Sequence, residues 1–188
     1  GAKTLEVVNP ATEEVIAEVA SAAQADVDAA VAAARAALEG PWAKLSARDR
    51  GRLVWRIGEK LLERADEIAR LETLDNGKPI FESRQIDIPS SAEGFEYFGG
   101  WAAKVMGETI PVKGTCLTYT LREPLGVVAA IVPWNFPLLL AAWKVAPALA
   151  TGNTVVLTPA SQTPLTALSL GEIAVEAGPP PGVLNVIP

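Results

Sequence analysis

The sequence has 188 residues, of which 49% are hydrophobic and 20% are charged, and its formal net charge is −6. This length supports one sizeable hydrophobic core or part of a larger one. Lysine and arginine form no cluster along the acidic sequence, which argues against nucleic acid and acidic membrane surfaces as partners.

The sequence contains no histidine and one cysteine, Cys116. The missing histidine removes the commonest general base and metal ligand, so no metal site is predicted. A single cysteine cannot form an intramolecular disulfide, and the cytoplasm is the expected compartment. The longest apolar runs are interrupted by prolines or by Lys144, so no segment is expected to span a membrane.

The first third of the chain is predicted to be helical. Residues 24–38 are rich in alanine and place their apolar side chains on one stripe. Residues 46–76 begin with a capping-box pattern and end at an Asn-Gly pair. The apolar spacing slips near residues 64–66, which leaves open whether this stretch is one helix or two. A further helix is expected over residues 90–105, after a break at Pro89.

The rest of the chain is predicted to contain both strands and helices. Residues 115–123 alternate in polarity and predict a strand. Residues 126–133 and 153–159 are short runs rich in valine or alanine, which is typical of parallel strands buried on both faces. Helices are predicted over residues 137–152 and 163–178, and a third strand over residues 182–188. This alternation indicates an α/β fold with a parallel sheet.

Polar residues follow the first two predicted strands, where ligands bind in parallel α/β sheets. Asn135 follows the first strand, inside the apolar segment IVPWNFPLLL, and residues 158–161 follow the second. A buried amide without a partner costs on the order of 1–3 kcal/mol, so Asn135 is expected to form a hydrogen bond with a specific partner. It either donates a hydrogen bond to an oxygen that becomes negative during a reaction, or it satisfies the backbone of its own turn.

Four segments together resemble the NAD(P)-dependent aldehyde dehydrogenase family. They are VVNPATEEVIAEVASA, ETLDNGKPIFESR, PWNFPLLLAAWKVAPALATGNTVVL and QTPLTALSLGEIAVEAG. They follow one another in the family's order, and the resemblance runs from near Leu5 to Pro188. The sequence has no G-x-G-x-x-G, P-loop or G-x-S-x-G motif that would favour another class of enzyme.

The resemblance implies roles for individual residues. Asn135 matches the family's oxyanion-hole asparagine, whose amide steadies the oxygen of the thiohemiacetal formed when a catalytic cysteine attacks the aldehyde. Lys144 matches a lysine associated with proton relay, and a helix-surface charge is its alternative role. Asp75 matches a loop residue tied to a structural monovalent cation in some members. Three further residues match the lining of the coenzyme cleft: Ile131, Pro133 and Trp134.

Two positions bear on the choice between NAD and NADP. The family pattern after the second strand is VVLKPAE or VVLKPAS, and here it is VVLTPAS. Thr158 therefore stands where a lysine contacts the adenosine ribose or the 2′-phosphate, which predicts weaker coenzyme binding, for NADP especially. Ser161 stands where many NAD-preferring members carry a glutamate, and a small residue there is common in members that tolerate NADP. The cofactor is thus predicted to be NAD or NADP.

The resemblance also implies a domain organisation. Residues 1–105 and 125–188 would form a partial coenzyme-binding domain with a Rossmann-like sheet. Residues 106–124 would form a β arm for oligomerisation, as in the family's homodimers and homotetramers. The catalytic cysteine and the general-base glutamate of the family are expected beyond this chain, so the catalytic domain would be absent and the chain alone inactive. Cys116 falls in the predicted arm strand and is not expected to be the nucleophile.

The expected function is therefore that of the N-terminal part of an aldehyde dehydrogenase. Such an enzyme oxidises an aldehyde to a carboxylic acid with NAD(P)+, through a cysteine thiohemiacetal and thioester. The alternative is a non-catalytic chain that binds partner subunits or coenzyme only.

Overall fold

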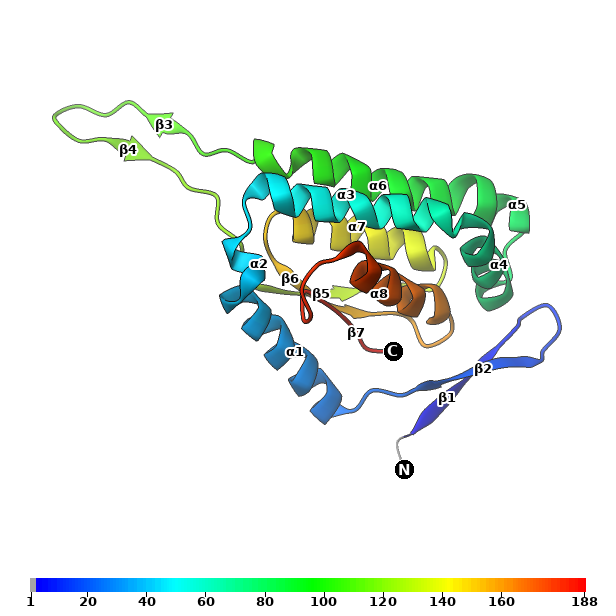
Figure 1. The fold of residues 1–188 in the computed structure, drawn as a ribbon. Coiled ribbons are helices and arrows are strands. Elements are labelled where there is room, and N and C mark those ends of the chain that lie inside the picture. The colour runs from blue at the N-terminus through cyan, green and yellow to red at the C-terminus, as the bar shows by residue number, and fades with distance from the viewer. Residues whose placement is uncertain (1–2) are drawn as a thin grey trace.

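The computed structural model describes residues 3–188 and confirms a mixed α/β fold (Figure 1). Its central sheet contains three parallel strands in the order β5-β6-β7. The strands are β5 (Val127–Ile131), β6 (Thr154–Thr158) and β7 (Leu184–Val186). Helices α7 (Pro137–Ala150) and α8 (Leu165–Ala177) connect them. The predicted strand–helix alternation of this half of the chain is confirmed, because each crossover returns the chain to a parallel neighbour.

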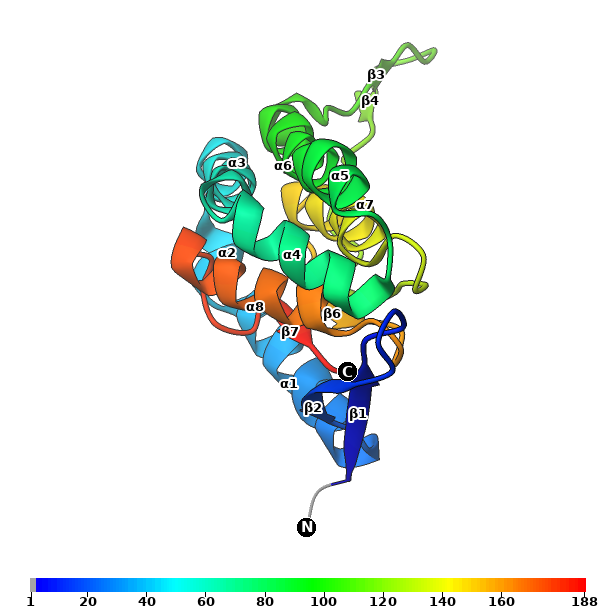
Figure 2. The same cartoon turned by 90° about the vertical axis from the view of Figure 1, so that its right-hand side faces the viewer.

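The helices lie in layers around this sheet (Figures 1 and 2). Helices α7 and α8 cover one face of the sheet, and α3 (Ala47–Glu63) and α6 (Ile88–Trp101) lie beyond them. Helix α1 (Gln24–Glu39) lies against the opposite face. The continuous hydrophobic core lies between the sheet and the two helix layers above it. Its largest fully buried side chains include Trp42, Phe95, Leu138 and Leu157.

The outer face of β5 differs from the prediction of a strand buried on both sides. Its inward side chain Ala130 is buried, whereas Ala129 and Ile131 on the other face are exposed. Helices α7 and α8 cover only the inward face, and α1 extends mainly over β6 and β7. The prediction holds for β6, whose first four residues are buried.

The predicted helices of the first half are largely confirmed. The slip in apolar spacing marks a true boundary, because α3 ends at Glu63 and α4 (Ala65–Asn76) begins two residues later. Ser46 caps α3 as predicted, since its hydroxyl oxygen accepts a hydrogen bond from the backbone N–H of Asp49 at 3.1 Å. A short helix, α2 (Pro41–Lys44), joins α1 to α3 and buries Trp42.

The predicted break at Pro89 is wrong. Helical structure runs from α5 (Ile80–Glu82) through the π-helical turn η1 (Ser83–Asp87) into α6, and a 3₁₀ turn η2 (Ala102–Lys104) follows. Pro89 is the second residue of α6. The wider π-helical turn before it relieves the clash that a regular helix would have between the proline ring and the carbonyl four residues earlier.

An N-terminal β-hairpin precedes the first predicted helix, so the prediction of a helical first third is wrong for residues 4–20. Strands β1 (Thr4–Val8) and β2 (Val15–Ala20) pair antiparallel, with a register shift between Val7 and Val8. The turn between them includes Glu13, which has a φ of 60°. Valine-rich alternation in β1 and β2 is the signal that could have predicted this hairpin.

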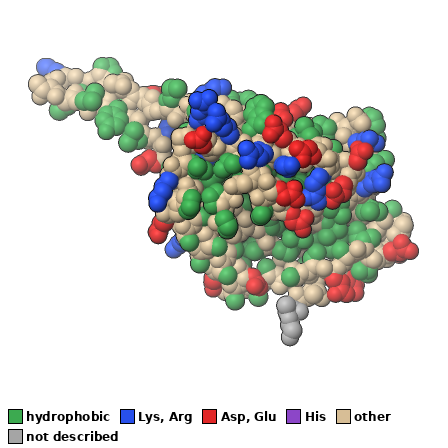
Figure 3. Space-filling model, viewed as in Figure 1, with side chains coloured by type: hydrophobic (Ala, Val, Ile, Leu, Met, Phe, Trp, Pro, Cys, Tyr) green, Lys and Arg blue, Asp and Glu red, His purple; other side chains and the backbone are tan. Residues whose placement is uncertain are grey.

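A second hairpin projects from the body as an arm (residues 106–124; Figures 1 and 2). Its strands are short: β3 (Thr109–Ile110) and β4 (Thr118–Tyr119). The strand predicted over residues 115–123 is therefore confirmed only at its centre, Thr118–Tyr119. Hydrophobic side chains lie along the arm surface (Figure 3), with Leu117 77% exposed and Leu121 69% exposed.

None of the helices in the described part of the chain combines the length and the apolar character that a membrane span requires.

Candidate functional site

Two loops meet at the carboxyl edge of the sheet. Ile131 and Thr158, the last residues of β5 and β6, are direct partners in the parallel register. The backbone N–H of Val132 continues this pairing by donating to the Thr158 carbonyl at 3.1 Å. The loop after β5 and the loop after β6 are therefore held side by side, as the sequence predicted.

The residues predicted to touch coenzyme lie on the surface of this edge. Ile131 is 69% exposed and Trp134 is 58% exposed. Thr158 is half-buried, and three others are exposed: Pro133, Asn135 and Ser161. The structure thus places all six on two neighbouring loops and strand ends, where a ligand could reach them.

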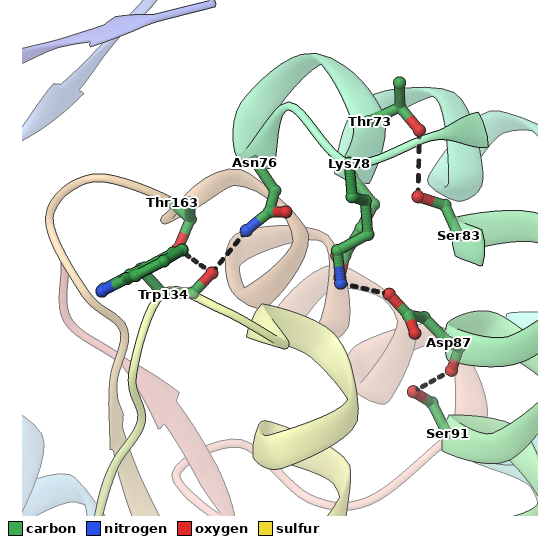
Figure 4. Close-up of polar contacts among 9 residues, drawn as sticks. Thr73, Asn76, Lys78, Ser83, Asp87, Ser91, Trp134 and Thr163 are labelled. Atoms are coloured by element: carbon green, nitrogen blue, oxygen red, sulfur yellow. Dashed lines mark hydrogen bonds and ion pairs between the residues drawn. The ribbon is translucent and has the colours of Figure 1, made fainter. Parts of the chain in front are cut away.

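Asn135 is exposed, so the expectation of a buried amide in need of a partner is wrong. The turn that carries it has no strand neighbour on its outer side, which leaves the side chain open to solvent. Hydrogen bonds at this turn instead end on the Trp134 carbonyl, which accepts from the Asn76 amide at 2.6 Å and from the Thr163 hydroxyl at 3.5 Å (Figure 4). The Asn135 amide is therefore available to an incoming group.

A shallow hollow of about 480 Å³ lies on the outer face of the sheet beside these residues. Ile131 and Thr158 line it at the carboxyl end. Its remaining walls come from the outer side chains of β5 and β6, from the α1 side chains Val27, Val31 and Arg35, and from Ala22, Ile187 and Pro188. This lining is mostly apolar, which suits a flat ring, and its polar side chains are Thr158 at the carboxyl end and Arg35 of α1.

Lys144 and Cys116 lie away from the two loops. Lys144 is exposed on α7, beside the exposed Trp143, and this position agrees with the alternative of a helix-surface charge. Cys116 is an exposed free thiol. It lies in the connection between β3 and β4, whereas the sequence placed it within a strand.

The segment that ends α4 also contributes to this edge, and no sequence pattern predicted its contribution. Asn76 is the last residue of α4, and Gly77 follows it with a φ of 83°, which turns the chain back on itself. Lys78 then points inward and forms a buried ion pair with Asp87 of η1 (Figure 4). The same ammonium lies 3.7 Å from a Glu72 carboxylate oxygen and 4.3 Å from the centre of the Phe136 ring.

Two buried carboxylates of α4 face the starts of the crossover helices. Asp75 accepts a hydrogen bond at 2.9 Å from the backbone N–H of Leu165, the first residue of α8. Glu72 faces the backbone N–H of Leu138 at the start of α7 and the Thr166 hydroxyl, although neither completes a hydrogen bond within the described residues. A carboxylate near a helix N-terminus is favourable, so α4 stabilises the first turns of both helices.

Burial dominates the electrostatics of these two groups. It raises the pKa of Glu72 to about 7, against the opposing influence of Thr166 and Lys78. Burial likewise raises the pKa of Asp75 to about 7, against the opposing hydrogen bond from Leu165. Asp75 lies within α4, as the helical pattern of residues 46–76 predicted, and not in a loop as the family resemblance implied. Within residues 3–188, no group of three or more carboxylates, cysteines or histidines is arranged to hold a metal ion.

A parallel sheet with helices on both faces and exposed loops at the carboxyl ends of its strands places the chain in the class of open α/β folds, in which ligands bind at that edge. Residues 1–188 match the model of the aldehyde dehydrogenase family, and the chain belongs to this family.

Individual relatives agree with this assignment. The mitochondrial aldehyde dehydrogenase family 2 member B4 of Arabidopsis thaliana is 52% identical over 98% of this chain and 35% of its own length. The mitochondrial aldehyde dehydrogenase of Homo sapiens is 50% identical over 99% of this chain and 36% of its own. Among solved structures, the NAD+ complex of aldehyde dehydrogenase from Bacillus cereus superposes with a TM-score of 0.97 at 48% identity, over 99% of this chain and 38% of that one.

The chain therefore spans little more than a third of the length of these relatives. The relatives come from mitochondria and from bacteria, so the compartment expected from the sequence stays a prediction.

Proposed function

We propose that the protein containing these residues oxidises an aldehyde to a carboxylic acid with NAD(P)+. The observation that carries this proposal is the position of Asn135, exposed on a turn beside the paired ends of β5 and β6. Family membership over the whole chain supports the enzyme over the alternative of a chain that only binds subunits or coenzyme.

Asn135 would act as a hydrogen-bond donor to the aldehyde oxygen. When a nucleophile adds to a carbonyl, negative charge develops on that oxygen, and a preorganised amide N–H stabilises it. Pro133 and Pro137 restrict the backbone on both sides of Asn135, so the donor needs little reorganisation during the reaction. The nucleophile would come from outside residues 1–188, since the thiol of Cys116 lies on the arm.

The coenzyme would lie across the carboxyl edge of the sheet and accept a hydride from the aldehyde carbon. Ile131, Pro133 and Trp134 would contact it from the loop after β5, and Thr158 and Ser161 from the loop after β6. The mostly apolar hollow beside Ile131 fits the adenosine part of such a ligand, with the Thr158 hydroxyl placed to hydrogen-bond a sugar. Neither Thr158 nor Ser161 carries the positive charge that a 2′-phosphate requires, which supports NAD, whereas Arg35 of α1 is the cation of the same hollow that could pair with such a phosphate in NADP.

Two further assignments belong to the same proposal. The arm would contact a second copy of the protein, because its exposed Leu117 and Leu121 side chains are too apolar to be left in water without a partner. Residues 1–105 and 125–188 would then form part of the coenzyme-binding domain of a homodimer or homotetramer. Lys144 would assist proton relay if the rest of the protein brings the reacting groups to the exposed face of α7.

The test is the activity of the protein expressed from the complete reading frame. We expect aldehyde-dependent formation of NADH, followed by its absorbance, with no formation when the aldehyde is omitted. A folded protein that binds NAD+ but forms no NADH with any of a panel of aliphatic and aromatic aldehydes would contradict the proposal.

A further inference from the structure

The turn that presents Asn135 is anchored from outside its own loop. Asn76, at the end of α4, donates a hydrogen bond from its side-chain amide to the Trp134 carbonyl at 2.6 Å (Figure 4). This contact joins residues 58 positions apart in the sequence and fixes the backbone immediately before Asn135. The Thr163 hydroxyl approaches the same carbonyl at 3.5 Å, which is a longer and weaker contact.

A second anchor holds the residue after Asn135. The Lys78 ammonium lies 4.3 Å from the centre of the Phe136 ring, within the range of a cation–π interaction. The ammonium is itself fixed, because Lys78 is buried and forms ion pairs with Asp87 and Glu72. The ring of Phe136 therefore rests on a cation that cannot move without breaking a buried ion pair.

Both anchors come from one short turn. Gly77 lies between them with a φ of 83°, and this left-handed conformation lets Asn76 and Lys78 point toward different parts of the loop. A side chain at this position would also meet the Pro10 ring at 2.5 Å. The turn after α4 is thus fixed by its own backbone and by the N-terminal hairpin.

We propose that Asn76 and Lys78 are positioning residues that set the orientation of the Asn135 amide. This inference rests on the proposed function of Asn135 as an oxyanion donor. Asn135 is exposed, so its amide projects from a position that the backbone on either side determines, and Asn76 and Lys78 hold those two sides. A misplacement of about 1 Å in such a donor can lower a rate about 100-fold.

The test is a pair of double-mutant cycles measured on the protein from the complete reading frame. Asn76→Ala and Lys78→Met are each combined with Asn135→Ala, and kcat is determined for all variants. Thr73→Ala is the matched control, because the Thr73 hydroxyl bonds the Ser83 hydroxyl at 2.9 Å between α4 and η1 without touching the Asn135 turn (Figure 4).

We expect Asn76→Ala and Lys78→Met to lower kcat about 10-fold or more when Asn135 is present. In the Asn135→Ala background each should lower kcat less than about twofold, because the group they position is gone. Thr73→Ala should lower kcat less than about twofold in both backgrounds.

Equal losses in both backgrounds, or no loss in either, would overturn the inference and leave the role of Asn135 intact. An Asn135→Ala variant with unchanged kcat would overturn the proposed function of Asn135 and the inference with it. Lys78→Met leaves Asp87 without its ion-pair partner, so this variant can fail to fold. In that case the Asn76 cycle alone tests the inference, because Asn76 is only half-buried and its substitution should be tolerated.

Discussion

Ile131 and Thr158 face each other at the ends of two parallel strands, and both line the same hollow. One is an exposed apolar side chain and the other a half-buried hydroxyl. Any ligand that rests on Ile131 is therefore within reach of position 158, which makes this position the most direct test of coenzyme binding.

Thr158→Lys should strengthen coenzyme binding, and NADP binding more than NAD binding. A lysine adds a charge-assisted hydrogen bond to a ribose hydroxyl or a 2′-phosphate, and such bonds contribute on the order of 1.5–3 kcal/mol, about 10-fold or more in Kd. Calorimetric titration of the complete protein with each coenzyme measures the change. Thr12→Lys, an exposed threonine in the N-terminal hairpin, is the control for added charge. Unchanged affinities in Thr158→Lys would refute the placement of this loop at the coenzyme.

Asn135→Ala should lower kcat by about 10²–10³ while leaving the melting temperature unchanged. The loss in rate is typical of the removal of one oxyanion donor. The stability should not change, because the side chain is exposed and the hydrogen bonds of its turn end on the Trp134 carbonyl. Steady-state kinetics and a thermal melt of the same preparation measure both quantities. A variant that loses stability and rate together would instead support the structural role that the sequence left open.

Glu72→Gln should stabilise the protein more at pH 8 than at pH 5. Burial raises the pKa of Glu72 to about 7 in the folded state, from an ordinary value of 4.5, so the folded state loses stability as the pH rises between these values. The difference corresponds to ~3 kcal/mol at most. Glutamine cannot ionise and escapes this loss, although Lys78 then keeps only Asp87 as its carboxylate partner.

Melting temperatures of the variant and the parent at the two pH values measure this effect. Glu59→Gln, an exposed glutamate on α3, is the control. The interpretation of Glu72 as a buried acid fails if the difference between variant and parent is the same at both pH values.

Gly51→Ala should destabilise the protein by about 1–3 kcal/mol, because it overpacks a helix crossing. Gly51 of α3 lies against Gly99 of α6, and a methyl group on Gly51 would collide with the Gly99 carbonyl oxygen and lie 3.0 Å from the Ala102 methyl group. Gly100→Ala on the facing helix α6 is the matched control, since a methyl group there meets only the Trp55 ring at 3.8 Å. Thermal melts should show a large loss for the first variant and little change or a small gain for the second. An equally small change for both variants would mean that the two helices move apart easily to admit the methyl group.

The sequence predicted the parallel sheet and its crossovers because those elements have strong local signals. Valine-rich runs, Pro164 before α8 and Gly178 after it mark the elements without reference to distant parts of the chain. The failures have tertiary causes. Pro89 is accommodated by a π-helical turn, which no local pattern indicates, and Ile131 is exposed because α1 lies mainly over β6 and β7 and leaves the end of β5 uncovered.

In the candidate site, too, the features with local sequence signals were predictable and the tertiary contacts were not. The sequence and the family resemblance identified the residues of the two loops, and the structure places their backbones together. The sequence could not predict the anchors at Asn76 and Lys78. The contacts of these residues with Trp134 and Phe136 join positions more than 50 residues apart. Asn76-Gly77 was interpreted only as a helix stop. The exposure of Asn135 was also missed, since apolar neighbours in sequence suggested burial.

Helix α4 places the Glu72 carboxylate near the start of α7 and the Asp75 carboxylate at the start of α8, so one helix stabilises the beginnings of both crossover helices. The loop that would carry the oxyanion donor and the loop that would select the coenzyme are therefore both supported by α4. Substitutions that shift α4 should alter rate and coenzyme preference together. Substitutions meant to change coenzyme preference alone are better confined to Thr158 and Ser161, which lie away from α4.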